Sequence, residues 1–233
     1  MKRIYLDYAA TTPVDPQVEK AMRPYFGSIF GNPGAIHYFG QQAQGVIVNS
    51  REKIAKLFGL NNSHQVIFTG SATEANNLAI RGVVKSFKLT RPNFKETWAG
   101  KQAKGNNMKP RIIVSAIEHK SILKTCRDLE KEGAAEIVYL PVSKEGMVNL
   151  EELKSALNKN TILVSVMYVN NEIGVIQPIA KISEIIRNFR CNNSLFPLFH
   201  TDAVQAVQFF ESNLGNLGVD LMTISGHKIY SPK

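Results

Sequence analysis

The chain has 233 residues, of which 44% are hydrophobic and 20% charged, and its formal net charge is +9. These proportions are typical of a soluble globular protein and exclude a disordered chain, and the length suffices for one large domain with a substantial core. Two cysteines, Cys126 and Cys191, are too few and too far apart for a disulfide framework or a Cys-x-x-Cys metal site, so a reducing, cytoplasmic setting is expected.

The N-terminus, MKRIYLDYAATTP, has no apolar region behind its two basic residues, so no signal peptide is predicted. The longest apolar run, Ile162 to Val169, has the length of a strand and is less than half of what a membrane span needs. We therefore expect no contact with a membrane.

Apolar, β-branched runs alternate along the chain with segments of helical spacing. Strands are predicted at Val66–Thr69, Arg111–Ser115, Glu136–Leu140, Thr161–Val169, Pro197–Thr201 and Asp220–Ser225, and helices include Ala72–Phe87, His119–Glu132, Leu150–Leu157 and Pro178–Arg190. This alternation predicts an α/β fold with a mainly parallel sheet sandwiched by helices. In such a sheet a ligand lies beyond the carboxyl ends of the strands.

The first candidate site residues follow the run VIFT. Gly70 and Ser71 are small, Ala72 and Thr73 open a predicted helix, and the first turn of a helix presents unpaired N–H groups. The segment is either a phosphate cradle or an ordinary helix N-cap that Ser71 or Thr73 would complete. A P-loop and a dinucleotide fold are both unsupported, because the sequence has neither of their glycine-rich motifs.

Further polar residues follow the later strands. His119 opens a predicted helix, and Asp202 follows a buried strand. Asn170 follows an apolar strand, and its spacing is compatible both with a turn device and with a hydrogen-bonding wall of a site. A carboxylate in the position of Asp202 is costly unless a cation meets it. Lys228 follows the last predicted strand, in SGHK.

These groups together fit pyridoxal 5'-phosphate better than other cofactors. It needs a lysine, an acid at its ring nitrogen, a helix terminus for its phosphate and a flat partner for its ring. We assign Lys228, Asp202, Thr73 with the adjacent N–H groups, and His119 to these four roles. Burial of Lys228 would make its neutral, nucleophilic form accessible.

The stretch between Lys85 and Arg111 carries eight basic residues against one acidic residue, and so seven of the nine net positive charges. It is rich in Gly, Asn and Lys, and Ser86 to Pro110 is interpreted as an exposed loop. With Phe87, Phe94 and Trp98 interleaved, the stretch could bind RNA or an acidic partner, or it could be a solvated insertion without a partner.

Seven segments resemble the cysteine desulfurases of the NifS/IscS-like branch, which are fold-type I pyridoxal phosphate enzymes. They are YLDYAATTPVDPQV, FGNPGAIHYFG, VIFTGSATEANNLAI, AIEHKSILKTCRDLE, ILVSVMYVNNEIGVIQPI, TDAVQAV and VDLMTISGHKIYSPK. The match runs from about Ile4 to Lys233 and is interrupted by the basic stretch and by Cys191 to Phe196. The implied organisation is an N-terminal arm at 1–14 and a large cofactor-binding domain at 15–233, incomplete and with a basic insertion at about 88–110.

The resemblance also implies roles for individual residues. Lys228 would bear the cofactor and His119 would stack on its ring and assist proton transfer; the other contacts would be Asp202 and Gln205 at the ring, Asn170 near its hydroxyl, and Ala72, Thr73, Ser225 and His227 at the phosphate. L-cysteine would be the substrate: the freed Lys228 removes its Cα proton, an enzyme thiolate takes its sulfur as a persulfide, and alanine is released. A homodimer, a sulfur-acceptor scaffold protein of iron–sulfur assembly, and tRNA thiolation are further implications.

The sequence also departs from the family. The chain looks truncated after the cofactor lysine, so the small domain and the loop with the nucleophilic cysteine are expected to be missing, and the fragment to be inactive alone. Cys126 aligns with a helix cysteine that is not the nucleophile, and Ser231 replaces a glycine that the family usually has. Three alternatives stay open: another fold-type I enzyme such as an aminotransferase or selenocysteine lyase, a non-catalytic half of a split enzyme, and an RNA-binding protein.

Overall fold

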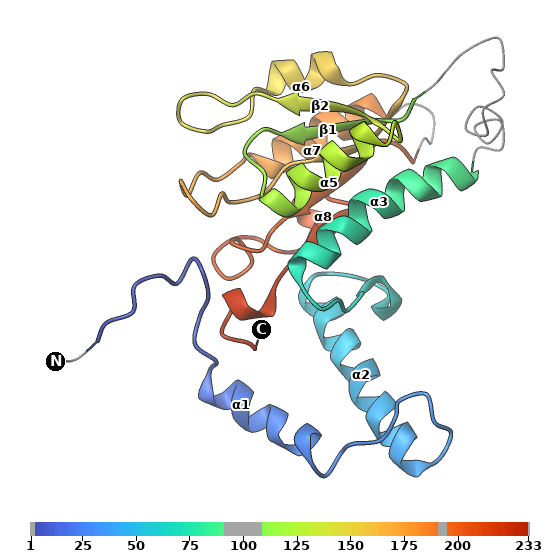
Figure 1. Cartoon of the computed structure of the whole chain (residues 1–233), viewed down its shortest axis with the longest axis vertical. Helices are drawn as coiled ribbons and strands as arrows, with labels where there is room; N and C mark the ends of the chain where they lie inside the picture. Colours follow the sequence, from blue (N-terminus) through green and yellow to red (C-terminus); the bar gives the residue numbers. More distant parts are fainter. Residues whose placement is uncertain (1–2, 91–108, 191–194, 233) are drawn as a thin grey trace.

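A computed structural model describes residues 3–90, 109–190 and 195–232 of the chain (Figure 1). Its centre is a sheet of five parallel strands, which are β1 Arg111–Ser115, β2 Glu136–Leu140, β3 Thr161–Ser165, β4 Leu198–Asp202 and β5 Leu221–Thr223. The spatial order is β2-β1-β3-β4-β5. The predicted α/β class and parallel sheet are therefore confirmed. The chain reverses its direction of travel across the sheet between β1 and β3, and such a switch point opens a crevice at the carboxyl ends of the two strands.

Helices cover both faces of the sheet. One face carries α3 (Ala72–Thr90) and α5 (Lys120–Lys131), and the other carries α6 (Leu150–Ala156), α7 (Ile179–Phe189) and α8 (Leu214–Leu217). Alternate residues of β1 enter the two layers: Ile112 and Val114 pack under α3 and α5, and Ile113 packs under α6 and α7. This alternation follows from the period of two in a strand and explains why the strands read as unbroken apolar runs.

Helix α5 shows how the sequence builds these layers. Ile122, Cys126 and Leu129 recur at spacings of four and three, and all three are buried against the sheet. Each aliphatic side chain of this kind contributes roughly 1.5–3 kcal/mol by leaving water. Because α5 is fixed along its buried side, its N-terminal residue His119 is fixed at the carboxyl edge of the sheet.

The N-terminal quarter of the chain lies away from this sandwich. The helices α1 (Pro16–Met22) and α2 (Tyr38–Leu57) extend from the end of the molecule where β4 and β5 finish, with short 3-10 turns at Arg23–Phe26 and Ser63–Gln65 (Figure 1). In α2 only Gly40 and Ala55 are buried. Helix α2 was not among the predicted helices, because a helix that buries so little has only a weak apolar stripe.

The predicted strand Val66–Thr69 is wrong. The segment forms no strand and pairs with no other strand in the part of the chain that the structure describes, and its side chains Ile67 and Phe68 are 65% and 50% exposed. Arg51 of α2 holds the segment instead: its guanidinium donates to the carbonyl oxygen of Val66 and lies 4.8 Å from the centre of the Phe68 ring. An apolar run has the composition of a strand, but pairing needs a neighbour.

The predicted loop at Ser86–Pro110 is also wrong at its start. Helix α3 continues to Thr90, and Phe87 is buried at 3% exposure with its ring 5.3 Å from that of Phe196, edge to face. Phe87 continues the buried stripe of Ile80, Val83 and Val84, so helical spacing places it in the core and not on an RNA-binding surface. Phe94, Trp98 and most of the basic stretch lie outside the described residues.

Candidate functional site

Asp202 is the last residue of β4, and its carboxylate is buried at 5% exposure. Its Oδ2 accepts a hydrogen bond from Asn76 Nδ2 at 2.9 Å, and its Oδ1 accepts one from the N–H of Val204 at 3.1 Å. Burial raises the pKa of Asp202, while these two hydrogen bonds and the nearby His119 and Lys228 lower it. Three residues that the sequence assigns to one site, far apart in the chain, are thus close enough to act on each other electrostatically.

Lys228 ends a 3-10 turn, η4 (Gly226–Lys228), that follows β5. Its ammonium donates to the carbonyl oxygens of Ala10, at 2.8 Å, and of Ala9. Burial lowers the pKa of Lys228, and the charges of Asp7 and Asp202 partly oppose that change. The described part of the chain therefore gives this lysine backbone carbonyls as partners and leaves it without a direct ion pair.

The N-terminal arm packs along the segment that carries Lys228. The carbonyl oxygen of His227 accepts the N–H and the hydroxyl of Thr12, both at 3.0 Å, and the hydroxyl of Thr11 lies 3.1 Å from His227 Nδ1. Gln205 Nε2 donates to the carbonyl oxygen of Ala9 at 2.9 Å. Two residues predicted to contact the cofactor, Gln205 and His227, are thereby held by the arm.

Thr12 and Asp15 also form hydrogen bonds with the backbone of the turn after Lys228. The hydroxyl of Thr12 accepts the N–H of Tyr230 at 2.8 Å, and the carbonyl oxygen of Tyr230 accepts the N–H of Asp15 at 2.9 Å. Tyr230 has φ of 60°, in the left-handed region that residues other than glycine seldom adopt. The backbone N–H of Ser231 donates to the carbonyl oxygen of Gly226, so the replaced glycine of the family pattern lies in a hydrogen-bonded turn.

His119 is exposed at the N-terminus of α5 and caps that helix. Its Nδ1 accepts the N–H of Ser121 at 3.2 Å and lies 2.7 Å from the hydroxyl of Ser121. The cap fixes the imidazole at the carboxyl end of β1, beside the switch point of the sheet.

The opening turn of α3 is capped by side chains of its own segment. Ser71 caps the helix, since its hydroxyl accepts the N–H of Glu74 at 3.2 Å while Glu74 Oε2 accepts the N–H of Gly70 at 2.7 Å. Thr73 is exposed, and it is Ser71 that serves as the cap. Helix α3 packs against β5, the strand that leads to Ser225. The hydroxyl of Ser225 makes no cap hydrogen bond to η4.

Asn170 acts as a turn device. Its Oδ1 accepts the N–H groups of Glu172 and Ile173 at 2.9 and 3.0 Å, and its Nδ2 donates to the carbonyl oxygen of Ile117 at 2.9 Å and lies 3.3 Å from the sulfur of Met167. The bond to Ile117 ties the end of β3 to the segment that carries His119. Among the described residues no side-chain hydrogen bond joins Asn170, Thr73 or Ser225 directly to Lys228 or Asp202, while the backbone N–H of Lys228 donates to the carbonyl oxygen of Ser225 at 3.3 Å.

Sequence reasoning missed four buried polar residues beside the site, namely Asn76, Glu118, Ser121 and His200. Burial raises the pKa of Glu118 well above its usual range. The charge of Asp202 raises this pKa further, while the hydrogen bond from the N–H of Met167 lowers it. Burial lowers the pKa of His200 to about 4, so it is neutral, and it lies between the hydroxyls of Ser165 at 2.9 Å and Thr223 at 3.1 Å. A polar residue at a position of the buried stripe is the signal that could have found Asn76.

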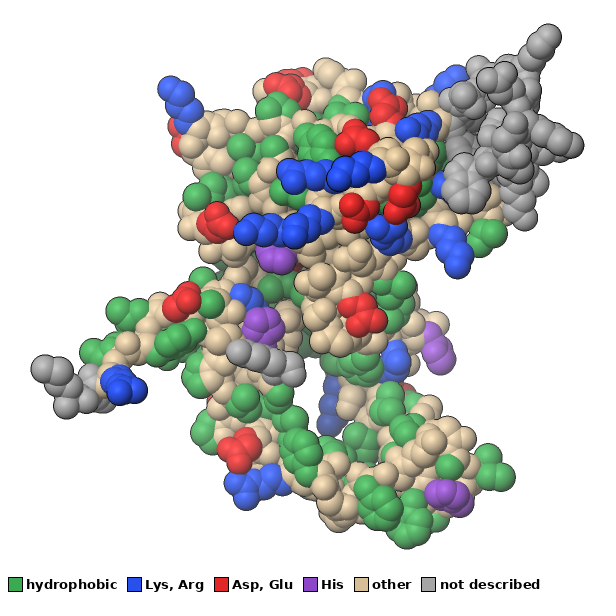
Figure 2. All heavy atoms as spheres, viewed as in Figure 1, with side chains coloured by type: hydrophobic (Ala, Val, Ile, Leu, Met, Phe, Trp, Pro, Cys, Tyr) green, Lys and Arg blue, Asp and Glu red, His purple; other side chains and the backbone are tan. Residues whose placement is uncertain are grey.

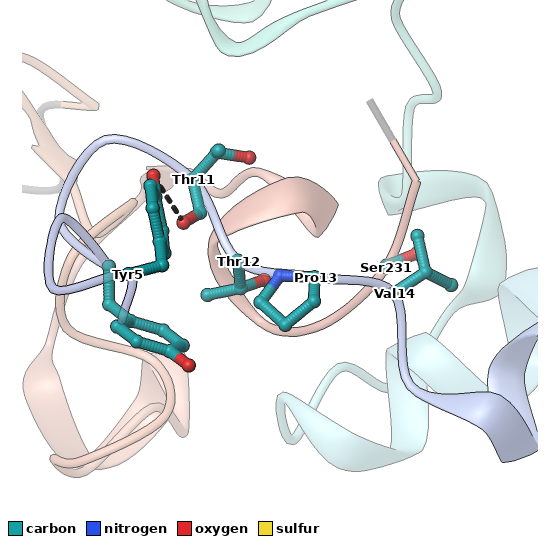
Figure 3. A pocket seen from close by; sticks show the side chains of 7 residues that line it. Tyr5, Thr11, Thr12, Pro13, Val14 and Ser231 are labelled. Atoms are coloured by element: carbon teal, nitrogen blue, oxygen red, sulfur yellow. Dashed lines mark hydrogen bonds between the residues drawn. The ribbon is translucent and has the colours of Figure 1, made fainter. Parts of the chain in front are cut away.

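A pocket of about 520 Å³ lies beside the arm, lined by Tyr5, Tyr8, Thr11, Thr12, Pro13, Val14 and Ser231 (Figure 3). In the close view the arm residues line one side, and the hydroxyl of Tyr5 donates to the carbonyl oxygen of Thr11. Lys228, Asp202 and His119 are not part of this lining. The candidate residues are therefore singled out by their chemistry and not by this pocket.

Cys126 is fully buried in α5, and burial raises the pKa of its thiol to about 12, with smaller contributions from Glu118 and Glu130. A nucleophilic thiolate needs access and a low pKa, so this residue does not serve as one. Cys191 lies outside the described residues. Within residues 3–90, 109–190 and 195–232, no cluster of three metal-ligating side chains occurs and no helix is long and apolar enough to cross a membrane.

The chain is similar to known proteins over its whole length. The family model "Aminotransferase class-V" matches residues 4–94 and 96–233. The cysteine desulfurase IscS of Dictyoglomus turgidum is 47% identical over 234 residues, which are 100% of this chain and 53% of that protein, and that of Rickettsia typhi is 45% identical over 99% of this chain and 50% of its own length. The chain thus spans about half the length of these curated relatives.

Solved structures show the same likeness. A NifS-like protein superposes with a TM-score of 0.86 at 34% identity, over 100% of this chain and 57% of that one. SspA in complex with cysteine superposes with a TM-score of 0.83 at 33% identity, over 99% of this chain and 59% of that one. By its matching family model and by these relatives, the chain belongs to the class-V aminotransferase family.

Proposed function

We propose that this chain is the cofactor-binding portion of a cysteine desulfurase that uses pyridoxal 5'-phosphate to remove sulfur from L-cysteine, leaving L-alanine and an enzyme persulfide. The observation that supports the proposal is that the charges of His119 and Lys228 both act on the buried carboxylate of Asp202, at the carboxyl end of β4. The names of the relatives support the desulfurase over an aminotransferase or selenocysteine lyase.

The residues present fit the cofactor. Lys228 is a primary amine whose partners among the described residues are backbone carbonyls, so it can exchange them for a covalent partner at modest cost. The carboxylate of Asp202 accepts one hydrogen bond on each oxygen and keeps lone pairs for a third donor. In the proposed arrangement Asp202 and Gln205 face the ring, Asn170 lies near the ring hydroxyl, and Ala72, Thr73, Ser225 and His227 hold the phosphate with the N-terminus of α3.

The bound cofactor supplies an electron sink that stabilises negative charge at the Cα of the substrate. The chain's own residues do the rest. In this proposal Asp202 would hold a proton on the ring nitrogen, Lys228, whose pKa burial lowers, would move the proton at Cα of cysteine, and His119 would stack on the ring and move a proton beside it.

We propose further that the 233 residues alone do not turn over cysteine. Cys126 is buried with a raised pKa, and the sequence places Cys191 in an insertion, so neither is the persulfide-forming nucleophile. The described chain thus accounts for cofactor binding and proton transfer but not for sulfur acceptance.

A homodimer is part of the proposal, as is a cytoplasmic role in sulfur supply to an iron–sulfur scaffold protein and to tRNA thiolation. The exposed apolar side chains of the N-terminal region support the dimer. Figure 2 shows hydrophobic side chains along the N-terminal arm and around α1 and α2. The side chains of this region that are more than 60% exposed include Ile4, Leu6, Phe26, Phe30, Ile36 and Tyr38. A patch of this kind marks an interaction site. Sedimentation of the purified chain tests the dimer, and a monomer at all concentrations would contradict it.

The decisive test is attachment of pyridoxal phosphate to Lys228. The chain is mixed with the cofactor, reduced with borohydride and digested, and the peptide with the added mass is identified. Attachment at Lys228, lost in Lys228→Ala and kept in the surface control Lys131→Ala, supports the proposal. No attachment, or equal attachment after Lys228→Ala, overturns it. In the same samples we expect no sulfide or alanine from cysteine, and clear turnover would refute the inactivity of these residues alone.

A further inference from the structure

The amide of Asn76 is fully buried in the second turn of α3 and uses only its donor side. Its Nδ2 donates one hydrogen to Asp202 Oδ2 and the other to Ser121 Oγ, both at 2.9 Å. Its Oδ1 has no hydrogen-bond partner in the described part of the chain. The opposite orientation would turn Oδ1 toward a carboxylate, which offers it no proton. The amide is therefore fixed by its two acceptors.

Ser121 extends this contact to His119. In the tautomer of His119 with Nδ1 unprotonated, that nitrogen accepts the backbone N–H of Ser121 at 3.2 Å, and the hydroxyl of Ser121, 2.7 Å away, is a second donor to the same lone pair. The same hydroxyl oxygen accepts from Asn76. In this tautomer Asn76 donates to Asp202 and to Ser121, and Ser121 donates to His119.

We propose that Asn76 and Ser121 are positioning residues that join Asp202 and His119 into one hydrogen-bonded unit. In the proposed function Asp202 is the acidic residue at the ring nitrogen of the cofactor, and His119 stacks on the ring. The inference rests on the proposed function for its purpose, but the unit itself is a property of the chain without cofactor. It couples three elements, namely α3, the N-terminus of α5 and the end of β4, so that the two groups keep a fixed separation and orientation.

The charge of Asp202 depends on this unit. The titratable groups that face it are His119 from the start of α5, Lys228 from η4 and Glu118 from the segment after β1. Burial favours the neutral acid, and the hydrogen bond from Asn76 is the largest influence in the opposite direction, ahead of the N–H of Val204 and of the two cations. The hydrogen bond from Asn76 thereby favours the anionic form of Asp202 and also fixes the orientation of its carboxylate.

The contact between Asn76 and Asp202 is tested by ¹³C NMR of the carboxyl carbon of Asp202, while the pH of the cofactor-free chain is raised. We expect Asn76→Ala to move the midpoint upward by roughly one pH unit, because a hydrogen bond to the charged form is lost. The matched control is Asn77→Ala, since Asn77 bonds to Thr125 and Thr73 and not to Asp202. A midpoint unchanged in Asn76→Ala, or moved equally in Asn77→Ala, overturns the proposal.

The contact between Ser121 and His119 is tested by ¹⁵N NMR of the His119 ring. Ser121→Ala should shift the Nδ1 resonance toward that of a nitrogen with one donor fewer, while Ser183→Ala, which removes an equally buried helical hydroxyl bonded to Gly218, should leave it unchanged. If Asn76→Ala does not fold, Asn76→Leu, of similar volume and without donors, replaces it. Because no cofactor is present, these results are independent of whether pyridoxal phosphate binds.

Discussion

Removing the hydroxyl of Thr12 should loosen the segment that presents Lys228. In Thr12→Val the shape is kept, but the donor to the carbonyl oxygen of His227 and the acceptor for the N–H of Tyr230 are both lost. Each neutral hydrogen bond contributes about 1 kcal/mol, so the pair holds the turn with about 2 kcal/mol. Tyr230 at φ of 60° adds a strain of about 1 kcal/mol that favours opening once these bonds are gone.

The assay is amide hydrogen exchange of Tyr230. A loss of about 2 kcal/mol in the local opening free energy predicts an exchange rate about thirtyfold faster. The matched control Thr12→Ser keeps the hydroxyl and should exchange close to the wild-type rate, and amides of β1 should be unaffected in both variants. A Tyr230 amide that exchanges at the wild-type rate in Thr12→Val would refute the claim that the arm stabilises the turn.

Three further predictions concern Cys126, Lys228 and Phe87. In Cys191→Ser, the remaining thiol of Cys126 should resist a thiol reagent until the chain unfolds, because it is buried with a pKa near 12; rapid labelling of folded protein would contradict this. Asp7→Asn should lower the pH at which half the chain carries borohydride-fixable cofactor, since the Asp7 charge raises the pKa of Lys228 and only the neutral amine attacks; Glu19→Gln is the control, and a midpoint that stays or rises would refute the coupling. Phe87→Ala should lower the free energy of unfolding in urea by about 3–4 kcal/mol, because the ring is buried in the core. A loss below about 1 kcal/mol would contradict the burial of Phe87.

The central strands β1 and β3 were predictable because they are buried on both faces, and strands covered on two sides need unbroken apolar sequence. The predicted runs RIIVS and EIVYL coincide with β1 and β2 at both ends, although β2, at the edge of the sheet, is only partly buried. Asp202, His119 and Lys228 could be found for a related reason: polar residues that follow such strands gather at one edge of the sheet.

The rest depends on contacts between distant residues. Asn76 lies 126 positions from Asp202 and 45 from Ser121, and no local pattern reveals that its amide joins them. Val66–Thr69 has the composition of a strand, yet composition does not state whether a neighbour is present. Helix α2 escaped prediction because it buries little, and little burial leaves little periodicity.

The extended segment Val66–Thr69 has a practical consequence for handling the protein. A stretch of apolar residues with no strand beside it within the described chain, and with Ile67 and Phe68 open to water, is a template on which a second molecule can add its own backbone. We expect concentrated solutions of these 233 residues to aggregate through this segment. A lysine at position 67 would be the simplest substitution to raise solubility without touching the cofactor site.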